Sequence, residues 1–199
     1  RVAASLGNIG LSDMKSGVSN MDEAAWGRLT VGIDKLGKKK FHIQERSDPT
    51  VYNICAAARK HKRKHGLDVL MVDHLGLMNH GDSRANDASK IGATTKALKN
   101  LALELNIVIL LLVQINRAGA QGDAKRPTLA NLRDSGRIEE DADIALLLHR
   151  DDYYRDEEEK KHDGFTHLIC AKVRDGDPKT VHLKFDGKYS RFSDWVGLP

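Results

Sequence analysis

Two short runs of the chain are apolar at every position, and each is followed by a polar side chain. Residues 69–72 read VLMV and precede Asp73, whereas residues 107–113 read IVILLLV and precede Gln114. A strand that is apolar on both faces is typical of a parallel sheet covered by helices. We therefore expect two neighbouring parallel strands, each with a functional side chain at its carboxyl end.

Amphipathic helices are predicted around these strands. Apolar residues recur at helical spacing over residues 21–36 and 88–105. Asp48 and Pro49 predict the N-terminus of a further helix, which Gly66 ends. Alternating strands and helices of this kind imply right-handed crossovers and a sheet flanked by helices.

Toward the C-terminus the pattern changes to strands without intervening helices. Residues 143–148, 165–173 and 180–185 are strand candidates separated by turn residues, which is typical of antiparallel hairpins. Residues 41–44, FHIQ, are one more short strand candidate. The chain thus predicts an α/β fold in one domain over residues 1–199: a mostly parallel central sheet flanked by helices, with antiparallel hairpin strands at its C-terminal edge.

The composition argues against a membrane protein and a secreted protein. The 199 residues are 40% hydrophobic and 30% charged, with a formal net charge of +4, which permits a nucleic-acid or nucleotide partner. No apolar run approaches the roughly 18 residues of a membrane span, and the first residues lack the layout of a signal peptide. We expect a cytoplasmic protein without a membrane partner, in which Cys55 and Cys170 are free thiols.

The acid after the first apolar strand suggests a nucleotide site. An apolar strand that ends in Asp is the Walker B arrangement, in which the carboxylate holds Mg²⁺ against nucleotide phosphates. An amide at the end of the next strand, here Gln114, can sense the terminal phosphate. A matching phosphate loop is missing: Gly32 to Lys38 fits GxxxxGK but lies within a predicted helix, and Lys39 replaces the Ser or Thr.

Two further groups of charged residues have open interpretations. In RDSGR, Arg133, Arg137 and the amide of Gly136 form either a phosphate-binding loop or an ordinary surface turn with salt bridges. Lys172 and Arg174 stand two apart on a predicted strand and share a face beside a turn. They are either solvated edge charges or an arginine-finger pair for a neighbouring subunit.

Taken together, these stretches resemble the ATPase domain of the DnaB-type hexameric replicative DNA helicases, which has a RecA-like fold. The resemblance extends from residue 67 to the end, and more loosely over the earlier residues. The passages that carry it are LDVLMVDHLGLM, SKIGATTKALKNLALELNIVILLLVQINR, KRPTLANLRDSGRIEEDADIALLLHRDDYY and CAKVRDGDPKTVHLKF.

The resemblance implies an ATP site with Mg²⁺ that is shared between subunits. Asp73 is then the Walker B carboxylate that binds the metal and nucleotide, and Gln114 is the sensor beside the γ-phosphate. Lys172 and Arg174 are implied to reach the ATP of the adjacent subunit as catalytic groups. A homo-hexamer is implied as well, because the site is complete only at a subunit interface.

The resemblance also implies DNA contacts and replication partners. Arg133, Asp134 and Gly136 belong to the loop that grips single-stranded DNA, along which the family moves in the 5′→3′ direction while unwinding duplex at the replication fork. Primase and a helicase loader are the implied protein partners, in a bacterial or phage setting. Two positions depart from the family pattern: His74 and Gly76 stand where Tyr and Gln are usual.

The chain begins beyond the family's Walker A strand, loop and helix and its N-terminal primase-interacting domain. We therefore expect a fragment that does not hydrolyse ATP alone. Two alternatives remain: a RecA-like recombinase or other strand-handling ATPase, and a non-catalytic DNA-binding assembly module. A GxxxxGK[ST] loop upstream of Arg1 would favour the motor, and unwinding would separate it from a recombinase.

Overall fold

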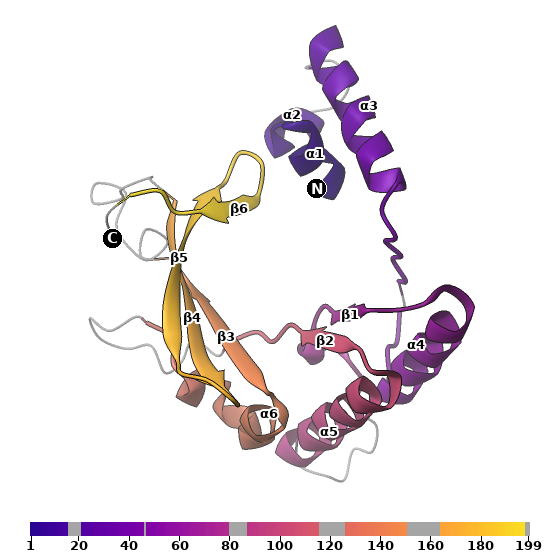
Figure 1. The fold of residues 1–199 in the computed structure, drawn as a ribbon, viewed down its shortest axis with the longest axis vertical. Helices are drawn as coiled ribbons and strands as arrows, with labels where there is room; N and C mark the ends of the chain where they lie inside the picture. Colours follow the sequence, from indigo (N-terminus) through magenta and orange to yellow (C-terminus); the bar gives the residue numbers. More distant parts are fainter. Residues whose placement is uncertain (16–20, 46, 80–86, 116–125, 151–163, 198–199) are drawn as a thin grey trace. The chain divides into compact units, whose positions relative to one another are not determined.

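The computed structural model describes the chain in two compact units, each treated by itself below (Figure 1). Unit 1 comprises Arg1–Gln44, Leu148–Ile169 and Thr180–Pro199, and unit 2 comprises Glu45–Leu147 and Cys170–Lys179. The described residues are all those of the chain except 16–20, 46, 80–86, 116–125, 151–163 and 198–199.

Unit 2 contains the predicted strand–helix–strand repeat. Its first elements are α4 (Val51–His65), β1 (Val69–Val72), the short 3-10 helix η2 (Leu75–Leu77), α5 (Asp87–Leu105) and β2 (Val108–Leu111). β1 and β2 pair in parallel, with Val69 opposite Val108 and Val72 opposite Leu111. The crossover helix α5 matches the predicted helix 88–105, so the βαβ unit is confirmed.

The core of unit 2 lies between α4, α5 and one face of the strand pair. Its most buried side chains include Cys55 and Ala58 of α4, Val72 of β1, and Leu98 and Leu101 of α5. These positions recur at helical spacing on α4 and α5, which is why the two helices present continuous apolar stripes to the sheet. Burial raises the pKa of the Cys55 thiol, and Cys55 is a free cysteine as expected.

The opposite face of the strand pair differs from the prediction of double burial. Val69 and Met71 of β1 and Val108 and Leu110 of β2 are exposed, with Val108 at 63%. Successive side chains of a strand point to opposite faces, and α4 and α5 pack against only one of them. Within the residues that the structure describes, the sheet therefore has one covered and one open apolar face.

The start of α4 also differs from the prediction. Thr50 rather than Asp48 is the N-cap, and its hydroxyl oxygen accepts a hydrogen bond from the Asn53 amide at 3.2 Å. A Thr side chain at this position satisfies an amide that the first helical turn leaves unpaired. Gly66 ends the helix with a φ of 78°, as predicted.

In unit 1 the helices form a small group of their own. They are α1 (Val2–Gly7), α2 (Leu11–Lys15) and α3 (Glu23–Gly37). α1 packs on α3 around Ala4, Ile9 and Leu29. The approach requires Gly32, because a Cβ there would lie 2.5 Å from the Ala3 carbonyl oxygen. α3 confirms the predicted helix 21–36.

Residues 41–44 do not form the predicted strand. The segment has no regular secondary structure, and Ile43 is 70% exposed. A strand is defined by its ladder of hydrogen bonds, and in the described chain FHIQ has no partner strand despite its alternating apolar residues.

The C-terminal strands form a four-stranded sheet in the order β3-β4-β5-β6. Their bounds are β3 (Ile144–His149), β4 (Phe165–Val173), β5 (Lys179–Asp186) and β6 (Arg191–Asp194). β5 and β6 run antiparallel, with Phe185 opposite Phe192. The predicted α/β fold is confirmed. The described ladders, however, separate this sheet from the β1–β2 pair, whereas the sequence predicted one continuous sheet.

Among the described residues, no helix is both long and apolar enough to cross a membrane.

Candidate functional site

Asp73 and Gln114 lie at the same edge of the β1–β2 pair. Asp73 directly follows β1, and Gln114 follows β2 after two more residues of extended chain; both are exposed. Because the strands are parallel and in register, their carboxyl ends meet at one edge. Within the described part of the chain the Asp73 carboxylate makes no hydrogen bond or ion pair, which leaves its oxygens available to a ligand.

Backbone hydrogen bonds hold these two strand ends together. The Leu112 amide donates to the Val72 carbonyl at 3.0 Å, and the Leu75 amide donates to the Leu112 carbonyl at 2.9 Å. Val72 immediately precedes Asp73, and Leu112 lies two residues before Gln114. The spacing of the two candidate side chains is therefore set by the backbone.

The turn after Asp73 is built around His74 and Gly76. The Gly76 amide donates to His74 Nδ1 at 3.1 Å, so the imidazole caps η2; the peptide bond between Asp73 and His74 is cis. A Cβ on Gly76 would lie 3.1 Å from His74 Cε1 and 3.2 Å from Nδ1. The next side chain, Leu75, is only 3% exposed and anchors the turn in the core. The two departures from the family pattern thus form one contact.

The far end of this turn is tied to the start of α4. The Asn79 amide donates to the Pro49 carbonyl at 3.0 Å, and Asn79 forms an isolated parallel bridge with Thr50, the N-cap of α4. Met78 is buried in the same core as Leu75. The Asp73 loop is consequently held by α4 on one side and by β2 on the other.

The GxxxxGK sequence is not a phosphate loop. Gly32 and Gly37 both lie in α3, and Lys38 pairs with Asp34 one turn earlier at 2.6 Å. A phosphate loop must follow a strand and open a helix, whereas this segment closes one. Its rejection from the sequence is confirmed.

The RDSG residues lie at the junction of η4 (Leu129–Ser135) and α6 (Gly136–Asp141). Gly136 is exposed and is the first residue of α6, whereas the side chains of Arg133 and Asp134 lie outside the described residues. α6 packs on α5 through the buried Ile138. The contact also needs Gly92, because a Cβ there would lie 2.7 Å from Cγ of Arg137.

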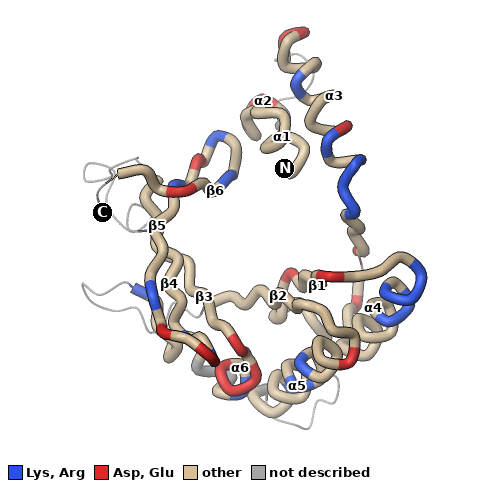
Figure 2. Tube along the Cα trace, viewed as in Figure 1, with Lys and Arg blue, Asp and Glu red and all other residues tan. Residues whose placement is uncertain are grey.

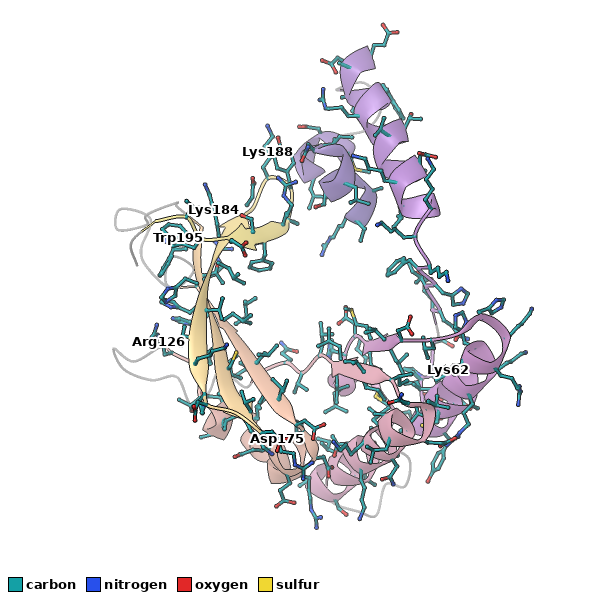
Figure 3. All side chains as sticks on the ribbon, viewed as in Figure 1. Lys62, Arg126, Asp175, Lys184, Lys188 and Trp195 are labelled. Atoms are coloured by element: carbon teal, nitrogen blue, oxygen red, sulfur yellow. The ribbon has the colours of Figure 1, made fainter. Side chains whose placement is uncertain are left out.

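Lys172 contacts the last turn of α6, and Arg174 contacts Asp143, which lies between α6 and β3. Lys172 Nζ donates to the carbonyls of Glu139 and Glu140, and Arg174 Nη1 pairs with the Asp143 carboxylate at 2.9 Å. The Arg174 amide also donates to the Asp143 carbonyl at 2.8 Å. Lys172 lies in β4, whereas Arg174 follows the strand and lies in the same turn as Asp175, which Figure 3 labels.

Asp143 contacts the candidate-site residue Arg174 and was missed by sequence reasoning. Hydrogen bonds from Lys99 of α5 and from Arg174 hold the pKa of its carboxyl below the ordinary value. A lone acid in front of a strand gave no signal of this role, because both partners are distant in sequence. Asp143 connects the crossover helix to the end of β4.

The residues at the β1–β2 edge fit a magnesium–nucleotide complex better than a metal held by protein alone. Within the described ranges, no group of three or more His, Cys, Asp or Glu side chains is placed to hold a metal ion. Mg²⁺ usually keeps several waters and takes one or two carboxylates together with substrate phosphates. A single free carboxylate at Asp73 meets that requirement.

Comparisons with known proteins find similarity over nearly the whole chain. The family model described as "DnaB-like helicase C terminal domain" matches residues 1–194. "Replicative DNA helicase DnaC" of Bacillus subtilis (strain 168) is 35% identical over 96% of this chain. "Replicative DNA helicase DnaB" of Haemophilus influenzae is 36% identical over 98% of it. The chain spans 42% and 41% of the length of these two curated relatives.

Solved structures give the same result. One solved ATPase domain matches with a TM-score of 0.91 and 31% identity, covering 98% of this chain and 69% of that one. "The Structure Of A DnaB-Like Replicative Helicase And Its Interactions With Primase" matches with a TM-score of 0.91 and 31% identity, over 98% of this chain and 46% of that one.

Proposed function

The chain belongs to the DnaB-like helicase C-terminal domain family, and from this premise we propose that it is part of a cytoplasmic replicative DNA helicase. The helicase uses ATP to move 5′→3′ on single-stranded DNA and unwinds duplex at the replication fork. Residues 1–199 act as one RecA-like ATPase domain. The observation that carries the proposal is the free Asp73 carboxylate beside Gln114 at the carboxyl edge of parallel strands.

In this proposal, Asp73 is the residue that would hold Mg²⁺ together with ATP. The metal would supply positive charge for phosphoryl transfer. Gln114 orients toward the terminal phosphate and reports whether it is present. The hydrogen bond from the Leu75 amide to the Leu112 carbonyl supports a link between Asp73 and Gln114, because a shift of the chain after β1 is passed to the chain after β2.

Lys172 and Arg174 complete the site of an adjacent subunit in a homo-hexamer. A guanidinium that stabilises the phosphoryl transition state accelerates hydrolysis strongly. The contacts with Asp143, Glu139 and Glu140 support this role, since they hold two flexible cations in a fixed place before a nucleotide arrives.

Arg133, Asp134 and Gly136 contact the backbone of single-stranded DNA. The position of Gly136 at the exposed start of α6 supports this assignment, because α6 is packed on α5 and α5 connects the two strands of the nucleotide edge. A helicase loader and primase are the proposed protein partners. Interaction with primase is named for the similar DnaB-like helicase structure.

The test is a matched pair of substitutions at the two ends of β1. Asp73→Asn in the complete helicase should reduce ATP hydrolysis and unwinding by at least about 100-fold, because it removes the metal-binding charge. Binding of single-stranded DNA should persist. Asp68→Asn makes the same chemical change just before β1, at its opposite end, and should leave hydrolysis within about twofold of the parent.

Retention of hydrolysis by Asp73→Asn would contradict the metal role. If the parent hydrolyses ATP in an Asp73-dependent way but never unwinds a forked duplex, the recombinase-like alternative replaces the helicase.

A further inference from the structure

The outer face of α4 carries more positive charge than the fold requires. The helix contains no Asp or Glu, and its last seven residues read RKHKRKH. The cations form a concentrated band at the C-terminal end of α4 (Figure 2). They are not spread among acids, as is usual for a solvated helix face.

Two of these cations have structural roles within unit 2. Arg59 donates to both carboxylate oxygens of Glu104 on α5, at 2.7 and 2.6 Å, and this pairing lowers the pKa of Glu104. Lys62 Nζ donates to the Leu67 carbonyl at 2.7 Å and ties the helix end to the segment before β1 (Figure 3). These contacts account for Arg59 and Lys62 as residues that stabilise the fold.

Lys60, Arg63 and Lys64 have no such role. All three side chains are exposed, and among the described residues none of them forms a hydrogen bond or ion pair. Lys60 and Lys64 are four residues apart, and like charges at this spacing destabilise a helix by about 0.2–0.5 kcal/mol. The helix dipole favours cations only in the last turn, which does not account for Lys60.

The free cations share one face with an exposed aromatic ring. At about 100° per residue, positions 52, 56 and 63 lie within about 40° of one another, and positions 60 and 64 lie about 80° and 120° around the helix from Tyr52. All five are on the side away from the buried Val51, Cys55 and Ala58. Tyr52 is 82% exposed, the highest value of any large aromatic side chain in the described chain. Ala56 between them is exposed and small, so it leaves room for a ligand to lie along the helix.

We propose that this α4 face, made of Tyr52, Lys60, Arg63 and Lys64, is a second binding surface for single-stranded DNA. The cations are spaced at about 5–6 Å between Cβ atoms and contact successive phosphates, while a base stacks on the Tyr52 ring. An acidic protein segment fits less well, because apart from Tyr52 the face has no large apolar side chain to pack against a protein partner.

This surface goes beyond the proposed helicase function. It lies on a different element from the nucleotide edge and from the RDSG residues, and its binding needs no ATP. A strand that leaves the motor would be retained on α4 while the loop at Gly136 holds the strand being translocated.

The experiment measures binding of the full chain to a labelled oligothymidylate of about 20 nucleotides by fluorescence anisotropy, without nucleotide. The triple variant Lys60→Gln, Arg63→Gln, Lys64→Gln should weaken binding at least about tenfold and lower the salt slope by about 2. The control removes the same charge from residues 38–40 in unit 1 and should weaken binding less than about threefold.

The aromatic contact is tested separately. Tyr52→Ala should weaken binding about fivefold or more, and Tyr52→Phe should restore it, because the ring is kept. Circular dichroism of each variant should match the parent, since exposed Gln and Ala are good helix formers.

Three outcomes would overturn the proposal. One is equal loss of binding by the α4 triple variant and by the 38–40 control. Another is loss of all binding on Arg133→Gln alone. The third is a polyglutamate probe that binds as tightly as the DNA while Tyr52→Ala has no effect. Because Asp73→Asn should lose hydrolysis and keep α4 binding, failure of the helicase proposal and failure of this one are distinguishable.

Discussion

His74 and Gly76 show how a single side chain sets the loop that follows the candidate metal ligand. The imidazole accepts the Gly76 amide, and the missing Cβ of Gly76 gives the ring its space. Where the family usually has Tyr and Gln, neither of these contacts would be made in the same way. Because His74 and Gly76 contact each other, the two departures from the family pattern act together. Asp73 stays at the end of β1.

This pairing predicts a strong dependence of one residue on the other. Gly76→Ala should destabilise the parent, because the new Cβ would lie about 3.1–3.2 Å from the imidazole. In a His74→Ala background the same change should be neutral or stabilising, since Ala costs less backbone entropy than Gly. Urea unfolding of all four proteins should give a coupling energy of about 0.5–3 kcal/mol.

His74→Asn provides the control for this cycle, because an Asn oxygen can accept the Gly76 amide as a cap. It should keep the stability that His74→Ala loses, about 0.5–2 kcal/mol. Additive effects of the two alanine substitutions would show that ring and glycine do not interact.

Elements with a long periodic pattern were predictable, and elements that depend on a distant partner were not. The predicted strand 165–173 coincides with β4, and α5 starts within one residue of the predicted helix 88–105. Residues 41–44 have equally good alternation but no neighbour to pair with in the described chain, and β6 was not predicted because RFSD lacks an apolar pattern. Pairing partners are a property of the fold, not of the segment.

The same distinction between local patterns and distant partners applies to the candidate site. The positions of Asp73 and Gln114 after β1 and β2 were predictable, because a polar residue after an apolar strand is a local signal; their roles stay a prediction. The role of Asp143 was not, since its partners Lys99 and Arg174 are 44 and 31 residues away in sequence. These charges are brought together by the arrangement of α5, β3 and β4, which no local pattern reveals.

The contact between α5 and α6 predicts that Gly92→Ala lowers the free energy of unfolding, whereas the same change at Gly27, outside this contact, raises it. Gly92→Ala places a Cβ 2.7 Å from the stem of Arg137, so α6 or that stem must shift. Overpacking of this kind costs about 1–3 kcal/mol and outweighs the gain of about 1 kcal/mol in helix propensity. We expect a net loss in unfolding free energy, together with weaker DNA binding through the loop that precedes α6.

Gly27→Ala in α3 is the matched control. A Cβ at Gly27 meets nothing within 4 Å, so only the propensity gain of up to about 1 kcal/mol should remain. Denaturant unfolding of both variants gives the comparison. Stabilisation by Gly92→Ala equal to that by Gly27→Ala would show that α5 and α6 are not in close contact.

At the scale of the whole molecule, the proposed nucleotide site is divided between chains. Asp73, the proposed metal-binding group, lies at the end of β1, whereas Arg174 follows β4 and is held by Asp143 of its own chain. A ring of identical subunits with a head-to-tail interface places the Arg174 of one chain against the nucleotide of the next. Each chain then contributes half of two different sites.

Division of the site between chains predicts recovery of activity on mixing two inactive variants. In the complete helicase, Asp73→Asn and Arg174→Ala should each abolish DNA-stimulated hydrolysis, and Arg174→Ala should still bind nucleotide. A site formed by Asp73 of an Arg174→Ala chain and Arg174 of an Asp73→Asn chain is intact. Random mixing in a ring makes about one site in four of this kind, so mixed assemblies should recover up to about a quarter of the parent rate.

The control mixes Asp73→Asn with the doubly substituted protein, in which no arrangement restores a complete site. Hydrolysis should stay at the level of the single variants there. Absence of recovery in the first mixture, despite subunit exchange shown by a fluorescent label, would place Arg174 in the site of its own chain. Equal loss of nucleotide binding and hydrolysis in Arg174→Ala would likewise count against a group that acts on the transition state, because such a group contributes little to the ground-state complex.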